Sequence, residues 1–148
     1  MTAQPGIDPG RIVVGVDGSK ASVAALRWAQ RVAMPTGSRI QAVITWNYPP
    51  EYGWAGAVDG WRPDLDAEKC LEVALDEAYV GNRPAGLEPI VRQGHARTVL
   101  LDAAAGAEML VVGSRGHGGF VGLLLGSVSA ACAEHARCPV LVVHDDTV

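Results

Sequence analysis

Residues 108–137 read EMLVVGSRGHGGFVGLLLGSVSAACAEHAR, and this stretch decides the fold. An apolar run over residues 108–113 has the length and composition of a buried strand. A glycine-rich loop follows, and a second apolar segment from about Ser127 to Arg137 predicts a helix. A strand that leads through glycines into a helix is typical of α/β proteins that hold a phosphate group at the helix start.

The glycines of this loop let the backbone approach a ligand closely, and successive free N–H groups can then form an anion-binding concavity. We expect a serine to cap the helix that follows. At its start, unpaired N–H groups and the helix dipole attract phosphate, and the hydroxyls of Ser127 and Ser129 can add donors. The loop contains no lysine and no Walker A motif. It also departs from G-x-G-x-x-G, because Val121 stands where that motif requires glycine. A mobile connector without a ligand is the alternative reading.

Working outward from this stretch, strands and helices alternate along the chain. Each connection is long enough for a helix, so we predict a parallel, doubly wound α/β sheet with helices on both faces. Pro89 lies inside one strand and removes a ladder donor, which places that strand at an edge. The predicted strands are residues 11–16, 40–46, 87–92, 108–113 and 139–144. The first predicted helix is capped by Ser19 and ends before Pro35, and the other helices are residues 64–80, 96–105 and 127–137.

Ligands of such sheets bind beyond the carboxyl ends of the strands, so the loops after the first and fourth strands are the expected site. The first helix is expected to bury Ala21, Ala25, Trp28, Ala29 and Val32, and Trp46 is a second tryptophan expected in the core. Trp54 and Trp61 lie in an irregular stretch over residues 47–63, where they form a lid, a partner surface or local packing.

Composition narrows the class of protein. The chain has 148 residues, of which 49% are hydrophobic and 19% charged, and this fits one globular domain. A net charge of −4 and the lack of a basic cluster argue against nucleic-acid binding. No apolar run is long enough to span a membrane. We expect residues 1–10 to be a flexible tail and residues 11–148 to be one domain. Three cysteines without a C-x-x-C pair favour the reducing cytoplasm.

Gly113-x2-Gly116-x9-Gly126-Ser127 resembles the G-2x-G-9x-G-[ST] signature of ATP-binding universal stress proteins. The resemblance extends from about Arg11 to His144. It includes the sequence VDGS over residues 16–19 and CPVLVV over residues 138–143. It implies a five-stranded parallel sheet in the order 3-2-1-4-5, which puts the Pro89 strand at an edge.

The resemblance also implies the roles of individual residues. Gly113 to Gly116 line the ribose and phosphates, and Gly126 to Val128 hold the phosphates. Asp17 lies at the ribose or near a bound Mg²⁺, and Thr45 contacts adenine. The expected nucleotide-binding residues are Val16, Asp17, Thr45, Val112, Gly113, Ser114, Arg115, Gly116, His117, Gly118, Gly126, Ser127, Val128 and Ser129.

The sequence shows no paired carboxylates, no nucleophile with a supporting base and no metal-ligand spacing among His95, His135 and His144. We therefore expect an ATP-binding regulatory module of the stress response rather than an enzyme. A binder of cyclic AMP or another adenine nucleotide, a dimeric scaffold, and a slow ATPase or phosphotransfer enzyme are the alternatives.

The fifth strand is apolar and lies at the second edge of the sheet in the order that the resemblance implies. Such an edge is a template for another chain, and a two-fold pairing would cover it. Relatives dimerise in this manner, so we expect a homodimer through Val140, Leu141, Val142 and Val143.

Overall fold

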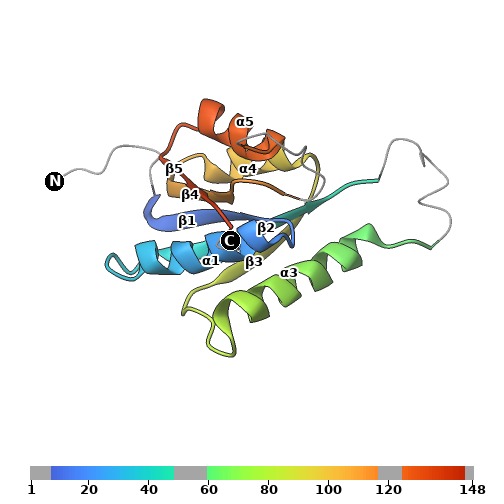
Figure 1. The fold of residues 1–148 in the computed structure, drawn as a ribbon, viewed down its shortest axis with the longest axis horizontal. Coiled ribbons are helices and arrows are strands. Elements are labelled where there is room, and N and C mark those ends of the chain that lie inside the picture. Colours follow the sequence, from blue (N-terminus) through green and yellow to red (C-terminus); the bar gives the residue numbers. More distant parts are fainter. Residues whose placement is uncertain (1–7, 49–59, 117–124, 146–148) are drawn as a thin grey trace.

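The fold is a five-stranded parallel sheet between two layers of helices, as seen in a computed structural model that describes residues 8–48, 60–116 and 125–145. The strand order β3-β2-β1-β4-β5 confirms the predicted doubly wound sheet (Figure 1). In chain order the elements are β1 (Asp8–Val16), α1 (Lys20–Ala33), β2 (Arg39–Trp46), α3 (Pro63–Tyr79), β3 (Glu88–Gln93), α4 (Ala96–Ala104), β4 (Ala107–Gly113), α5 (Ser127–His135) and β5 (Val140–Val143).

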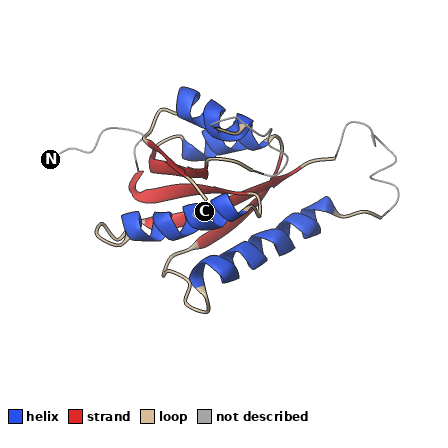
Figure 2. Ribbon diagram, in the orientation of Figure 1, coloured by secondary structure: helices blue, strands red, loops and turns tan. Residues whose placement is uncertain are grey.

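Helices α1 and α3 cover one face of the sheet, and α4 and α5 cover the other (Figure 2). The alternation of side chains along β1 divides the core in the same way. Ile12 and Val14 are buried toward α1 and α3, whereas Val13 is buried toward α4 and α5. Both faces of the central strands are therefore apolar, as a parallel sheet covered on both sides requires.

The two edges of the sheet are β3 and β5. Pro89 lies in β3 and pairs with Ala42 of β2, so the edge position predicted from that proline is confirmed. None of the described helices is both long and apolar enough to cross a membrane.

Some element boundaries differ from those predicted. β1 begins at Asp8 rather than Arg11, because Asp8 pairs with Ala107 of β4; residues 8–10 of the expected tail thus belong to this strand. Helix α5 ends at His135 rather than Arg137, because Ala136 has an extended conformation with ψ of 145°. The remaining boundaries shift by one residue or agree.

Trp28 does not join the core, contrary to the prediction from the helical stripe of α1. Its side chain is 41% exposed, and the guanidinium of Arg31 lies 4.9 Å from its ring centroid. Each residue of an α-helix is rotated by about 100° from the one before it. Trp28 therefore lies to the side of the fully buried Ala29, at the margin of the stripe. Trp46 is half-buried and packs against the core on the side of α1 and α3.

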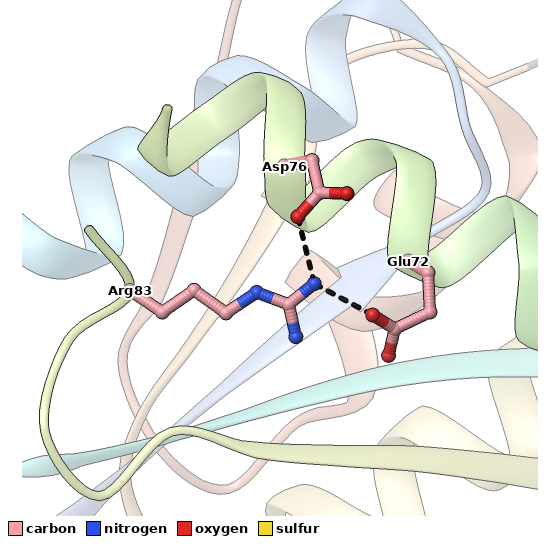
Figure 3. Close-up of polar contacts among 3 residues, drawn as sticks. All are labelled: Glu72, Asp76 and Arg83. Carbon is pink, nitrogen blue, oxygen red and sulfur yellow. Dashed lines mark hydrogen bonds and ion pairs between the residues drawn. The ribbon is translucent and has the colours of Figure 1, made fainter. Parts of the chain in front are cut away.

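One arginine attaches the turn that follows α3 to the side of that helix. The guanidinium of Arg83 donates to the carboxylates of Glu72 at 2.6 Å and Asp76 at 2.9 Å, which draws the turn after α3 back onto the helix (Figure 3). All three side chains are partly exposed, so this pairing contributes about 1 kcal/mol or less.

Val80 ends α3 in a strained conformation. Its φ of 27° lies in the left-handed region, where a β-branched side chain is disfavoured, and the residue is 81% exposed. Asparagine tolerates this region better. We expect Val80→Asn to raise the free energy of unfolding by about 1 kcal/mol through relief of this strain. Urea unfolding followed by circular dichroism measures the change.

Val73→Asn is the matched control, because Val73 is also an exposed valine of α3 but lies within the helix. Asparagine there loses helix propensity, so this variant should be no more stable than the parent protein. Equal stability of the two variants would contradict the strain at Val80.

Candidate functional site

A cavity of about 640 Å³ opens at the carboxyl ends of β1, β2 and β4, where the strand order predicts a ligand site. Its volume is within the range of sites for small ligands. The predicted site residues that line it are Val16, Asp17, Thr45, Val112, Gly113, Arg115, Gly116, Gly126, Ser127, Val128 and Ser129. The structure therefore gathers residues from both predicted loops around one space. His117, Gly118 and Trp54 lie outside the described residues.

Of the predicted site residues that the structure describes, Ser114 is the one that does not line the cavity. It is buried, and its carbonyl accepts hydrogen bonds from the Gly126 N–H at 2.7 Å and the Ser129 hydroxyl at 2.9 Å. Its own N–H donates to the carbonyl of Val143 at 2.7 Å. Ser114 thus fixes the start of α5 against the end of β4 and positions residues that face the cavity.

The first turn of α5 presents backbone donors to the cavity. Gly126 is the N-cap, with φ of −69° and ψ of 166°, and no side chain caps the helix. This corrects the prediction that a serine caps α5: Ser127 is its first helical residue, and Ser129 donates to the carbonyls of Ser114 and Gly126. The N–H groups of the first helical turn have no intrahelical partner. They form the positive end of the helix dipole at the cavity wall.

The start of α1 meets the same cavity from the opposite side. Ser19 caps this helix as predicted, because its hydroxyl oxygen accepts from the Ser22 N–H at 3.2 Å. The Ser19 hydroxyl also lies 3.4 Å from the carbonyl of Arg115, and its N–H donates to Asp17 at 2.9 Å. Two helix N-termini and the guanidinium-bearing Arg115 therefore surround one space.

The three signature glycines are needed for different reasons. A Cβ at Gly113 would lie 2.7 Å from the Cβ of Ala21 and 2.9 Å from the Ser22 nitrogen, so Gly113 allows α1 to approach β4. A Cβ at Gly116 would collide with the carboxylate of Asp17. A Cβ at Gly126 would meet its nearest neighbour, the Cα of Arg115, at an ordinary 3.5 Å. The fold itself thus leaves room at Gly126, and the space beside it belongs to the cavity.

Asp17 follows β1 directly and is exposed to the cavity. Its position against Gly116 brings the loops after β1 and β4 together. Among the residues that the structure describes, no group of three histidine, cysteine or acidic side chains could hold a metal ion by itself. Asp17 is therefore a single carboxylate beside the cavity rather than part of a complete metal site.

The walls formed by α3 and α4 were not predicted from the sequence. Pro63, Ala67 and Cys70 line the cavity from α3, and Ala96 and Leu100 line it from α4. Cys70 is half-buried and also packs against the core on the side of α1 and α3. The apolar stripe of α3 extends through Ala67, but periodicity alone does not show that the first turns of this helix project past the sheet.

A model of the universal stress protein family matches residues 9–144. The chain belongs to the universal stress protein family. The universal stress protein Rv2624c of Mycobacterium tuberculosis is 33% identical over 135 residues, which cover 89% of this chain and 47% of that protein. The chain spans about half the length of the curated relatives that it matches.

Solved universal stress proteins share the fold. A crystal structure of a universal stress protein in complex with cAMP is 28% identical, has a TM-score of 0.65, and the match covers 92% of this chain and 97% of that one. The universal stress protein UspA from Lactobacillus plantarum has a TM-score of 0.73 at 20% identity, over 90% of this chain and 96% of that one.

Proposed function

We propose that this chain binds an adenine nucleotide at the cavity, with ATP and Mg²⁺ as the favoured ligand, and acts as a nucleotide-dependent regulatory module of the stress response. The observation that carries this proposal is the meeting of the α1 and α5 N-termini with Arg115 around an unfilled space beside Gly126. We further propose that the expected domain of residues 11–148, extended by residues 8–10 of β1, acts as one unit in the cytoplasm.

The phosphate end of the site lies at α5. Backbone N–H groups of Ser127, Val128 and Ser129 begin this helix, and each is directed along the axis away from the helix body. Such a set of donors, together with the dipole, stabilises negative charge without any lysine. Arg115 adds a full positive charge to the same cavity. A triphosphate, with its larger negative charge, gains more from this arrangement than a cyclic monophosphate.

Asp17 fits a role with Mg²⁺. This ion is usually held by one or two carboxylates together with phosphate oxygens and water, rather than by a complete cage of protein ligands. A single exposed carboxylate at the mouth of a phosphate cradle meets that requirement. When bound, the ion would neutralise charge between neighbouring phosphates, while Asp17 would hold it on the side of α1.

Cyclic AMP is the second candidate ligand, because a universal stress protein that is 28% identical has been solved in complex with cAMP. A slow ATPase is disfavoured on chemical grounds. Among the described lining residues Asp17 is the acidic side chain that could orient an attacking water, and the proposal assigns it to Mg²⁺ instead. We therefore propose binding without turnover at ordinary enzyme rates.

Gly126→Val tests the phosphate cradle. The free protein has room for a Cβ at this position, so the variant should fold, but the branched side chain would occupy the space of the phosphates. We expect Mg-ATP affinity to fall about tenfold or more, equivalent to about 1.4 kcal/mol. Isothermal titration calorimetry with Mg-ATP and, separately, with cAMP measures both candidate ligands.

Ala133→Val is the matched control, because Ala133 is an exposed residue of the same helix and does not line the cavity. It should bind like the parent protein. Unchanged Mg-ATP affinity in a folded Gly126→Val variant would rule out the cradle. If the parent protein binds cAMP more tightly than ATP, cAMP is the favoured ligand instead. Phosphate release at ordinary enzyme rates would favour the enzyme alternative.

We also propose a homodimer through the free side of β5. The carbonyls of Pro139 and Val143 accept hydrogen bonds from the N–H groups of Leu110 in β4 and of Ser114 directly after it, at 2.9 and 2.7 Å. Because peptide groups alternate along a strand, those of Val140 and Val142 face away from β4. No other described strand pairs with this side of β5. Leu141 and Val142 are only half-buried, so the edge presents apolar surface, and the described strands leave its outward backbone groups without a strand partner.

Val142→Pro tests this pairing sharply. Proline removes the N–H that faces outward but none of the bonds to β4, so the monomer should remain folded. Light scattering should report about twice the 15.4 kDa chain mass for the parent protein and for a Val142→Thr control, which keeps the N–H, but a monomer for the proline variant. A parent protein that is monomeric at micromolar concentrations, or a proline variant that still dimerises, would contradict the proposal.

A further inference from the structure

The exposed apolar side chains gather on one layer of helices. Among the residues that the structure describes, seven large hydrophobic side chains are exposed, and one of them, Val91, belongs to the edge strand β3. The other six belong to α1 or α3 or lie within two residues of their ends: Trp28, Met34, Trp61, Leu65, Val73 and Val80. Single exposed apolar residues are normal on a protein surface, but their concentration on one face is typical of an interaction site. We call the outward surface of these two helices the α1–α3 face.

The charged side chains of α1 are all basic. Lys20, Arg27 and Arg31 are exposed and lie at positions i, i+7 and i+11, so they form one stripe along the helix. The guanidinium of Arg27 donates to the carbonyl of Glu77 at 3.0 Å, which places this stripe on the side of α1 that borders α3. Helix α1 therefore presents a positive stripe directly beside its neighbour.

Helix α3 has the opposite character. It carries six acidic residues and one lysine. Glu68, Glu72 and Asp76 are exposed at positions i, i+4 and i+8, so they form an acidic stripe along the helix. Arg83 pairs with Glu72 and Asp76 and offsets part of this charge. The stripe nevertheless remains negative, and Glu68 marks its end nearest to the start of α3.

The two stripes lie at the same level along neighbouring helices. Helices α1 and α3 cover the same face of the sheet side by side (Figure 1), and the hydroxyl of Tyr79 donates to the carbonyl of Leu26 at 2.6 Å. Both helices connect parallel strands and run in the same direction, so Lys20 and Glu68 lie within about one turn of each other in height. Within the described part of the chain, no ion pair joins a carboxylate of α3 to a basic side chain of α1.

We propose that the α1–α3 face binds a second copy of this chain, about a two-fold axis that runs along the line where α1 and α3 meet. Such an axis places α1 of each copy over α3 of the other and preserves the level of every residue. The basic stripe of one copy then meets the acidic stripe of its partner. A face with one sign of charge would repel its own copy, whereas a face that is basic on one side and acidic on the other is complementary to itself.

The size of the face predicts a weak association. The 14 residues of α1 extend about 21 Å, and two neighbouring helices are about 20 Å wide. Contact over such an area buries less than the roughly 1,200 Å² in total at which stable interfaces begin. We therefore expect pairing through this face at hundreds of micromolar rather than at micromolar concentrations. This interface is separate from the proposed pairing through β5, and it does not depend on nucleotide binding.

Sedimentation velocity of the Val142→Pro variant without nucleotide gives the first test, because this variant lacks the proposed pairing through β5. Its average mass should rise from 15.4 kDa toward twice that value as the concentration increases from about 10 to about 500 μM in low salt. Salt between about 0.01 M and 1 M shortens the Debye length from about 30 Å to about 3 Å, so this change should raise the Kd about fivefold or more. An average mass that does not increase with concentration in low salt would overturn the proposal.

Exchange of charges in the same variant gives the second test. Lys20→Glu and Glu68→Lys each bring like charges together across the two-fold axis, and each should raise the Kd about fivefold or more. The double variant restores opposite charges in exchanged positions, so its Kd should return to within about twofold of the starting value. Arg97→Glu and Asp102→Lys are the matched controls, because they make the same charge changes at exposed positions of α4, and they should leave the Kd unchanged.

Recovery in the double variant separates crosswise pairing from a general effect of charge or of lost stability. A double variant that associates no better than the two single variants would show that α1 and α3 of different copies do not meet, and so would contradict the proposal. Equal weakening by Glu68→Lys and Asp102→Lys would contradict it as well. Circular dichroism verifies that each variant is folded, and the result leaves the proposed nucleotide site untouched because nucleotide is absent throughout.

Discussion

Two hydrogen bonds to the carbonyl of Ser114 determine where the cavity lies. The Gly126 N–H and the Ser129 hydroxyl both donate to this buried carbonyl, which holds the first turn of α5 at the end of β4. Next to it, Gly113 allows α1 to approach so closely that no side chain would fit between them. Two helix N-termini consequently meet above the central strands, and the backbone N–H groups that begin α5 lie at the cavity wall.

The same central strands explain why the cavity is asymmetric. Gly15 lets Leu100 pack onto β1 from the side of α4, and Leu100 forms part of the cavity wall on that face of the sheet. On the other face, small residues at the start of α3 leave space opposite Trp46.

Much of this architecture could be predicted because the sequence encodes it locally. Alternating apolar runs gave the parallel sheet, Pro89 marked an edge strand, and Ser19 marked the start of α1. Features that depend on tertiary contacts could not be predicted. Gly126, rather than Ser127, caps α5, because the Gly126 N–H donates to the carbonyl of Ser114. Trp28 lies at the margin of the buried stripe of α1. The place of Cys70 in the cavity wall depends on how far α3 extends past the sheet.

The central claim is that the backbone N–H groups at the start of α5 hold the phosphates of a nucleotide. The most direct measurement is a backbone amide NMR titration of the isotope-labelled protein with Mg-ATP. The amide signals of Ser127, Val128 and Ser129 should shift strongly and saturate together, because each proton acquires a charged acceptor. Saturating ATP that leaves these three signals in place, while the protein remains folded, would contradict the account.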